Sequence, residues 1–210
     1  EESKKALCSF YKDGVGICEV SHRWPIFENL LFDTCELVKE HLKTPDDYTV
    51  LFLPGGASLQ FAAIPLNFLQ QSQISDYIIS GIWSNKAYYE AQKLGKTNIC
   101  ASGEASNFTI LPKIFNFSPE SAYVHFTSNN TIYGTEWQQE PPVAKTANLI
   151  CDASSNLFSR PLAVNKYALI YASAQKNFGP SGLCLVIIKK SFLETAKDST
   201  PSMLNYKVHE

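Results

Sequence analysis

The sequence predicts an α/β fold with a mostly parallel sheet and helices on both faces. Short apolar runs alternate with segments of helical periodicity, and glycines end several of these runs. The runs lack the polar alternation of a half-exposed strand, which favours strands buried on both faces. The 210 residues are 45% hydrophobic and 18% charged, close to the average of globular domains and enough for a large core.

The charge balance excludes a dedicated nucleic-acid binder. The 18 Lys+Arg residues and 20 Asp+Glu residues give a net charge of −2, without the basic excess that a phosphate backbone requires. The longest apolar run, Leu183 to Ile188, is far shorter than the roughly 20 residues of a membrane span. The sequence does not open with a signal-peptide pattern. We therefore expect a soluble, cytoplasmic protein.

The cysteines and histidines predict neither disulfides nor a metal site. The 6 cysteines include no Cys-x-x-Cys pair, and the 4 histidines show no metal-ligand spacing. Cys100, Cys151 and Cys184 lie inside apolar runs, where a reduced cysteine behaves as a small hydrophobic residue. Unpaired thiols in a reducing compartment are the expectation.

Helices and strands can be assigned in chain order. Residues 1–10 show the apolar spacing of a helix, and Pro25 to Leu42 predicts an amphipathic helix that begins at its proline. Tyr48 to Leu53 predicts a buried strand, followed by a helix over Ser58 to Leu69. A second such unit has its strand over Asp76 to Ile82 and its helix over Ser84 to Leu94. Five further runs predict strands: Thr97–Ala101, Ala122–Thr127, Asn148–Asp152, Ala168–Ser173 and Leu183–Ile188.

Small and polar residues gather after the predicted strands, where open α/β sheets bind ligands. The residues concerned are Gly55–Gln60, Trp83, Asn129–Thr131, Asp152, Ser154, Ser155, Gln175 and Lys176. Taken singly, each has an ordinary structural interpretation: a tight turn at Gly55, packing by Trp83, an N-cap at Asp152 and a surface charge at Lys176. Their position on one rim of one sheet favours a ligand site.

The combined chemistry of this rim suits pyridoxal 5′-phosphate. The glycine turn and the following helix N-terminus can hold the phosphate, and the Trp83 indole can stack on the pyridine ring. The Asp152 carboxylate can keep the ring nitrogen protonated, so that the cofactor works as an electron sink. Lys176 supplies the amine for a Schiff base. Competing signatures, such as a Gly-x-Ser-x-Gly elbow or a phosphate-binding P-loop, are absent from the sequence.

Six segments, in order along nearly the whole chain, resemble the phosphoserine aminotransferase family of class-V, fold-type-I pyridoxal-phosphate enzymes. The segments are Glu19–Arg23, Leu51–Asn67, Gly81–Ser84, Asn129–Gly134, Asp152–Ser155 with Ser159–Pro161, and Ala172–Gly182. The resemblance implies transamination between O-phospho-L-serine with 2-oxoglutarate and 3-phosphohydroxypyruvate with L-glutamate, in serine biosynthesis. The same family often serves vitamin B6 synthesis through 4-phosphohydroxy-L-threonine, and the sequence leaves that substrate open.

The resemblance also implies a role for each site residue. Lys176 would be catalytic, binding the cofactor and moving the proton at the substrate's α-carbon. The implied cofactor-binding residues are Ala57, Ser58, Trp83, Thr131, Asp152, Gln175 and Lys176. Ala57, Ser58 and Gln175 would contact the phosphate, and Thr131 would contact the region of the ring's 3′-oxygen. Arg23, with His22 beside it, would receive the substrate's distal carboxylate or phosphate, which suits a bidentate guanidinium.

By the same resemblance, residues 1–210 form a large cofactor-binding domain that is incomplete at both ends. The family has a glycine-proline segment before the matching region, and an Asn-Thr pair and a small C-terminal domain after it. It forms homodimers with active sites at the subunit interface.

Two alternatives to this transaminase remain open. One is a non-catalytic fragment that binds the cofactor or a partner only. The other is a different fold-type-I enzyme, such as a cysteine desulfurase or a lyase. A desulfurase needs a mobile nucleophilic cysteine, whereas Cys151 and Cys184 lie within predicted strands.

Overall fold

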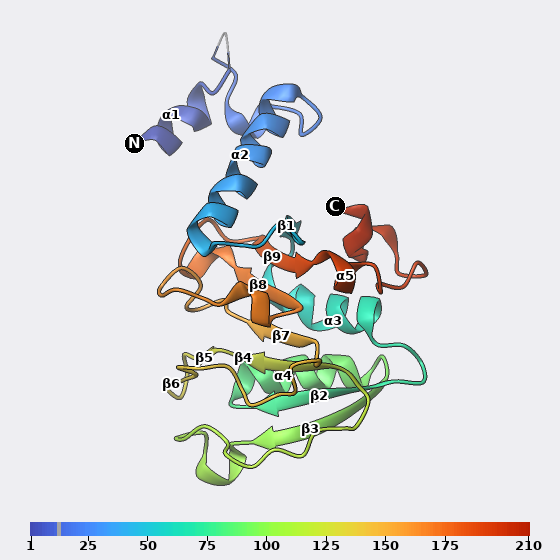
Figure 1. Cartoon of the computed structure of the whole chain (residues 1–210). Helices are drawn as coiled ribbons and strands as arrows, with labels where there is room; N and C mark the ends of the chain where they lie inside the picture. Colours follow the sequence, from blue (N-terminus) through green and yellow to red (C-terminus); the bar gives the residue numbers. More distant parts are fainter. Residues whose placement is uncertain (12–13) are drawn as a thin grey trace. The chain divides into compact units, whose positions relative to one another are not determined.

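The computed structural model describes residues 1–11 and 14–210, which form two compact units, Glu1–His41 and Leu42–Glu210. The first unit holds α1 (Glu2–Cys8), the 3-10 turn η2 (Ile17–Glu19) and nearly all of α2 (Pro25–Leu42) (Figure 1). The helix predicted over Pro25 to Leu42 is confirmed with the same bounds. None of the helices in the described part of the chain is long and apolar enough to cross a membrane.

The second unit contains the sheet and the remaining helices. Its helices and strands are β1 (Tyr48–Pro54), α3 (Gly56–Phe68), β2 (Ile74–Ile79), α4 (Ile82–Gln92), β3 (Lys96–Ser102), β4 (Ser121–Thr127), β5 (Asn129–Asn130), β6 (Thr135–Glu136), β7 (Leu149–Asp152), β8 (Leu169–Ser173), β9 (Leu183–Lys189) and α5 (Lys190–Leu193). Its 3-10 turns are η3 (Glu104–Ser106), η4 (Val164–Lys166), η5 (Ala174–Lys176), η6 (Ser202–Leu204) and η7 (Tyr206–Val208). Every predicted strand is present, and the structure also contains the short β5–β6 pair, which was not predicted.

The main sheet has seven strands in the order β1-β9-β8-β7-β4-β2-β3. The pairs among β8, β7, β4, β2 and β3 are parallel, whereas β9 runs antiparallel to both β1 and β8 (Figure 1). The segment 174–182 between β8 and β9 is shorter than the dozen residues that a parallel crossover needs. The prediction of a mostly parallel α/β sheet is confirmed, and β9 is the exception.

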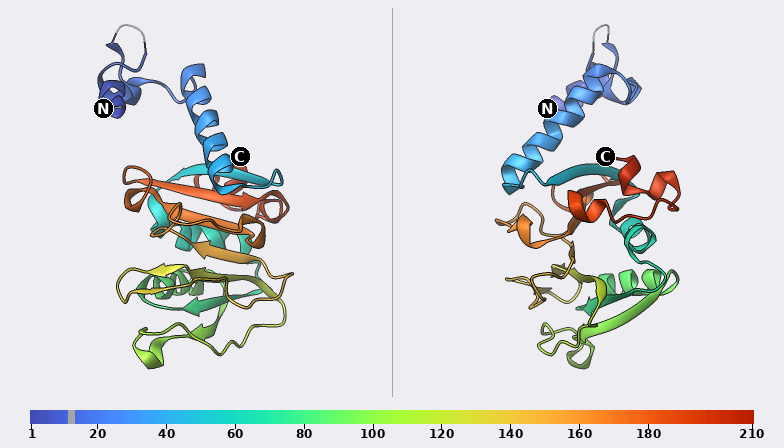
Figure 2. Two further views of the ribbon diagram at one scale, coloured as in Figure 1. Left: turned by 60° about the vertical axis from the view of Figure 1, so that its left-hand side comes forward. Right: turned by 45° about the vertical axis from the view of Figure 1, so that its right-hand side comes forward.

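The two long helices of this unit pack against each other and against one face of the sheet (Figure 2). A single apolar cluster joins Phe61, Ile64 and Phe68 of α3 with Ala87 and Ala91 of α4 and with inward side chains of the central strands. The other face is covered in part by the irregular segment 137–167, whose rings pack on Phe126. Within this unit, α3 and α4 therefore cover one face of the sheet. The expectation of helices on both faces is met for that face.

The strand predicted over Asp76 to Ile82 ends earlier, at Ile79, and Ile82 begins α4 instead. The reason is local capping. The Ser84 hydroxyl accepts hydrogen bonds from the backbone N–H groups of Ser80 and Gly81, at 3.0 and 3.1 Å. These bonds satisfy donors that a helix start leaves free, so the chain turns at Ser80 and Gly81.

Candidate active site

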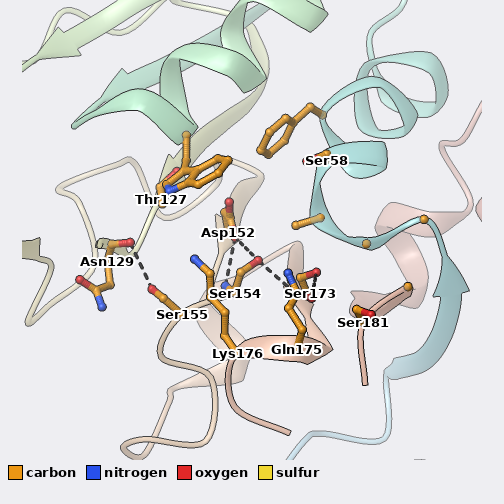
Figure 3. Close-up of a pocket in the computed structure, with 16 residues that line it drawn as sticks. Ser58, Thr127, Asn129, Asp152, Ser154, Ser155, Ser173, Gln175, Lys176 and Ser181 are labelled. Atoms are coloured by element: carbon orange, nitrogen blue, oxygen red, sulfur yellow. Dashed lines mark hydrogen bonds between the residues drawn. The ribbon is translucent and has the colours of Figure 1, made fainter. Parts of the chain in front are cut away.

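A pocket of about 250 Å³ opens at the rim of the main sheet. It is lined by Gly55, Gly56, Ala57, Ser58, Phe61, Trp83, Thr127, Asn129, Asp152, Ser154, Ser155, Ser173, Gln175, Lys176, Ser181 and Gly182. Figure 3 shows Asp152, Lys176 and Ser58 around this one hollow, although they come from three separate parts of the chain.

The sheet topology gathers these residues. Strands β4, β7 and β8 are parallel, so their carboxyl ends, with Thr127, Asp152 and Ser173, meet at one edge. β1 runs in the same direction, because it is antiparallel to β9 and β9 is antiparallel to β8. The turn after β1 therefore reaches the same edge, where the Gly55 N–H donates to the Gly182 carbonyl at 3.0 Å.

The turn after β1 forms the wall at the N-terminus of α3. Gly55 and Gly56 both have positive φ, 89° and 66°, a conformation that glycine adopts without a steric penalty. A Cβ at Gly56 would lie 3.1 Å from the Ser173 hydroxyl oxygen, so the backbone there approaches the pocket closely. The first N–H groups of α3 have no intrahelical acceptors and, with the helix dipole, favour an anion beside Ala57 and Ser58.

Asp152 ends β7 with its side chain 4% exposed. Its Oδ1 accepts hydrogen bonds from the Ser154 backbone N–H and hydroxyl, at 3.0 and 2.6 Å. Burial raises the pKa of Asp152 above the usual value, and the Ser154 bonds and the Lys176 ammonium oppose that shift. Asp152 therefore orders the following turn, as its N-cap interpretation predicts, and it also lines the pocket; its contact with a ligand stays a prediction.

Trp83 is held at the pocket by the start of α4. The Asn130 side chain occupies the place where a Cβ of Gly81 would lie and donates to the Ser80 carbonyl. Two ammonium groups lie near the indole, Lys86 at 4.8 Å and Lys176 at 5.4 Å from the ring centre. These distances are within the range of cation–π attraction, so Lys176 and Trp83 are held on the same side of the site.

The pocket brings together most, but not all, of the residues singled out in the sequence. Ala57, Ser58, Trp83, Asp152, Gln175 and Lys176 all line it. Thr131 does not line it and is exposed, one residue after β5. His22 and Arg23 belong to the first unit and are exposed. Their predicted contacts with cofactor and substrate stay predictions.

Thr127 and Ser181 line the pocket but were not expected there. Thr127 is 5% exposed, and its Oγ1 has no hydrogen-bond partner among the described residues. It pairs in register with Asp152, so the two side chains lie on the same face of the sheet. Its place as the last residue of a predicted strand was the available signal. Ser181 carried no such signal, since it reaches the pocket through the turn before β9.

Comparison with known proteins identifies the family. A family model described as aminotransferase class-V matches residues 5–204. The chain belongs to the class-V aminotransferase family.

Individual relatives of this class-V chain carry one name. Phosphoserine aminotransferases from Halalkalibacterium halodurans and Desulfosudis oleivorans are each 47% identical over 100% of the chain. A solved phosphoserine aminotransferase from Bacillus circulans subsp. alkalophilus superposes with a TM-score of 0.94 at 38% identity, over 99% of this chain and 58% of its own. A PLP-bound phosphoserine aminotransferase from Trichomonas vaginalis has a TM-score of 0.91 at 35% identity, over 99% of this chain and 59% of its own. The chain spans 58% of the length of the two curated relatives.

Proposed function

We propose that this chain is the cofactor-binding part of a phosphoserine aminotransferase that uses pyridoxal 5′-phosphate. One observation carries the proposal: a single pocket is lined by the buried Asp152, by Lys176, by the Trp83 indole and by the N-terminus of α3. Residues 1–210 would then be a large cofactor-binding domain. The names of the relatives, at 47% identity, support the choice of substrate class.

The residues present fit the phosphate end of the cofactor. The absence of a Cβ at Gly56 leaves space beside the Ser173 hydroxyl, and the first N–H groups of α3 are free to meet an anion there. The Ser58 hydroxyl can add a donor. The Ser173 hydroxyl donates to the Gln175 side-chain oxygen at 2.6 Å, which orients the Gln175 amide so that its N–H groups remain available to an anion.

The residues present also fit the ring. The buried Asp152 would pair with the ring nitrogen, and Trp83 would cover the ring face. The Thr127 hydroxyl, which has no partner among the described residues, would donate to a polar atom of the bound ring system. The retained hydrogen-bonding capacity of this buried hydroxyl supports a polar ligand at this place.

The positions of these groups suggest a role for each of them in the proposed reaction. When bound, the cofactor supplies the electron sink that stabilises negative charge at the substrate's α-carbon. Lys176 would hold the cofactor covalently and move the proton at the α-carbon, as a general base and acid. Asp152 would keep a proton on the ring nitrogen, and Trp83 would exclude water from the ring face.

The proposed reaction exchanges the amino group between O-phospho-L-serine with 2-oxoglutarate and 3-phosphohydroxypyruvate with L-glutamate, as in serine biosynthesis. Arg23, with His22, would receive the distal carboxylate or phosphate of these substrates, because a guanidinium binds either group through two parallel hydrogen bonds. Their exposure on the first unit leaves both side chains available to an anion. Acceptance of 4-phosphohydroxy-L-threonine belongs to the same proposal.

We also propose a cytoplasmic homodimer. Five cysteines, Cys8, Cys18, Cys100, Cys151 and Cys184, are free thiols, which supports a reducing compartment. Helix α2 exposes Leu30, Leu31, Phe32 and Leu37 by 40 to 64%, and large exposed apolar side chains on one helix favour a protein interface. Light scattering of the purified chain measures the mass directly.

The cysteine desulfurase alternative is disfavoured by thiol chemistry. Cys151 and Cys184 are buried on β7 and β9, and burial raises the pKa of both thiols. A nucleophilic cysteine has to be accessible and readily ionised.

Cofactor titration followed by reduction tests the proposal. Pyridoxal phosphate is added to the purified chain, its absorption is recorded, the mixture is reduced with borohydride, and the modified peptide is mapped. The expected result is one adduct, on Lys176. An adduct spread over exposed lysines, or none, would contradict the proposal. Turnover of phosphoserine against cysteine and other amino acids then decides the substrate.

A further inference from the structure

We propose that Ser154 is a positioning residue for Asp152. Its hydroxyl fixes one oxygen of the carboxylate against the protein and leaves the other oxygen to the cofactor's ring nitrogen. This inference rests on the proposed function, in which Asp152 pairs with that nitrogen. Ser154 lines the same pocket and is 7% exposed. Figure 3 shows it between Asp152 and Ser173, with hydrogen bonds on both sides.

The position of Ser154 follows from the point at which β7 ends. Asp152 is the last residue of β7 and pairs in register with Tyr171 of β8. The Ala153 N–H still donates to the Tyr171 carbonyl, at 2.9 Å. Strand β8 runs on to Ser173, and there the acceptor is a side chain, since the Ser173 N–H donates to the Ser154 hydroxyl at 3.1 Å. Ser154 thus connects the Asp152 carboxylate to the end of the strand that leads into η5 and Lys176.

The groups around the Ser154 hydroxyl determine where its proton lies. A backbone N–H can only donate, so the Ser154 oxygen accepts the bond from Ser173. Its single proton then goes to Asp152 Oδ1, which lies 2.6 Å away. The Ser154 N–H donates to the same oxygen at 3.0 Å. Two donors on Oδ1 leave Oδ2 as the oxygen that can take up a proton or meet a cationic ring nitrogen.

Four other titratable groups face Asp152. They are Cys151 of its own strand, Tyr171 of β8, Cys184 of β9 and Lys176 of η5. Burial raises the pKa of the phenol and of both thiols, so these three groups are neutral in the pH range where a carboxyl titrates. Lys176 and the two Ser154 donors favour the charge on Asp152, which burial disfavours.

Ser128 provides the matched control. It is 6% exposed, does not line the pocket, and its hydroxyl lies 3.0 Å from the main-chain carbonyl oxygen of Asp152. Ser128→Ala therefore removes a buried hydroxyl that contacts the same residue without a bond to its carboxylate. Ser154→Thr is the conservative variant, because threonine keeps a hydroxyl that can both accept and donate.

The first experiment needs no cofactor. Carbon-13 NMR of the chain labelled at its aspartate carboxyls, with Asp152→Asn to assign the resonance, follows ionisation of Asp152 against pH. We expect the titration midpoint to rise by about one pH unit in Ser154→Ala, because the ionised form loses a hydrogen bond. The midpoint should be unchanged in Ser128→Ala and should stay close to the original in Ser154→Thr. An unchanged midpoint in Ser154→Ala would overturn the inference.

Hydrogen exchange separates positioning from a merely structural role. The Ser173 N–H loses its acceptor in Ser154→Ala, so exchange at that amide should accelerate. A serine that only joined the two strand ends would change this exchange and leave the Asp152 midpoint where it was. We expect both to change.

The second experiment links the carboxylate to the ring nitrogen. The affinity for pyridoxal 5′-phosphate, divided by that for 1-deazapyridoxal 5′-phosphate, which lacks the nitrogen, is measured against pH. The ratio should fall on the acid side as Asp152 takes up a proton, because an ion pair is then lost. In Ser154→Ala this fall should move to higher pH by the same interval as the carboxyl midpoint, and in Ser128→Ala it should not move.

Two failures of the second experiment have different meanings. A ratio that falls at the same pH in the original chain and in Ser154→Ala would overturn the inference. Failure of the original chain to bind pyridoxal 5′-phosphate would instead contradict the proposed function, and the NMR titration would still decide whether Ser154 holds the Asp152 carboxylate.

Discussion

Asp76 and Asp152 are two buried aspartates on strands of the same sheet, 0% and 4% exposed, and their surroundings differ in kind. Both oxygens of Asp76 are occupied by protein donors. Asn98 Nδ2 and the Ser118 hydroxyl bond to Oδ1 at 2.7 and 2.8 Å, and the Ser118 N–H bonds to Oδ2 at 2.9 Å. Asp76 thereby fastens the segment before β4 to the sheet.

Asp152 has its donors on one side. Ser154 directs both of its bonds to Oδ1, and the carboxylate lines the pocket near Lys176. Burial raises the pKa of Asp152, so a cationic ligand atom would find a carboxylate whose charge is incompletely compensated. A buried carboxylate surrounded by donors stabilises the fold, whereas one that is open toward a pocket can bind.

The largest expected effect concerns the lysines beside Trp83. Lys176→Ala should abolish the borohydride-fixed adduct and lower transamination by at least about three orders of magnitude, because it removes both the covalent anchor and the proton carrier. Lys86→Ala is the matched control. Its ammonium lies closer to the Trp83 ring, 4.8 against 5.4 Å, but it does not line the pocket. Mass spectrometry and turnover assays check both. A Lys176→Ala protein with unaltered turnover would refute the assignment.

Exchanging each aspartate for asparagine tests the comparison itself. Asp152→Asn should lower transamination about 100-fold, in the range seen when a preorganised electrostatic group is removed, and should change the free energy of unfolding by less than about 1 kcal/mol. Asp76→Asn should cost about 3 kcal/mol of unfolding free energy, since three donors lose a charged acceptor, with turnover per folded molecule retained. Urea denaturation and kinetics separate the two. The comparison fails if both variants lose mainly stability.

The sequence could distinguish these two aspartates in part. Asp152 ends its apolar run and was assigned to the ligand rim, whereas Asp76 is the third residue of β2. Position along a strand decides which carboxylates reach the edge. The donors to Asp76 could not be predicted, because Asn98 and Ser118 are brought to it by strand pairing and by an irregular segment.

The same limit, that contacts between distant segments do not follow from local sequence patterns, explains which pocket residues were predicted. Strand ends and glycines indicated Gly55–Gly56, Trp83 and Asp152, because local patterns determine where strands stop. The position of the Thr127 hydroxyl in the pocket could not be predicted, because it depends on the register of β4 with β7. Thr131 was expected at this rim because it follows a predicted strand, and the resemblance gave it a contact with the ring; the structure leaves it exposed, outside the lining.

The third prediction uses the pKa of Asp152. Burial raises the folded-state pKa above the unfolded value of roughly 3.9, so the ionised carboxylate opposes folding. The unfolding free energy of the original chain, relative to Asp152→Asn, should fall as pH rises from the unfolded to the folded pKa, and then stay level. Paired urea titrations from acid to neutral pH measure this difference. A rise with pH over that window would mean that the hydrogen bonds outweigh burial.

The smallest expected effect concerns Thr127, on the open side of Asp152. Thr127→Val should weaken cofactor binding by about threefold to tenfold, the effect of one neutral hydrogen bond. It should not lower stability, because the hydroxyl has no partner among the described residues. Thr200→Val is the matched control, since its buried hydroxyl donates to the Leu66 carbonyl at 2.9 Å, away from the pocket. That variant should lose about 1 kcal/mol of unfolding free energy and bind cofactor normally. If Thr127→Val instead destabilises the fold and leaves cofactor affinity unchanged, the Thr127 hydroxyl stabilises the fold, as Asp76 does. Fewer of the groups beside Asp152 would then be available to a ligand than the pocket lining indicates.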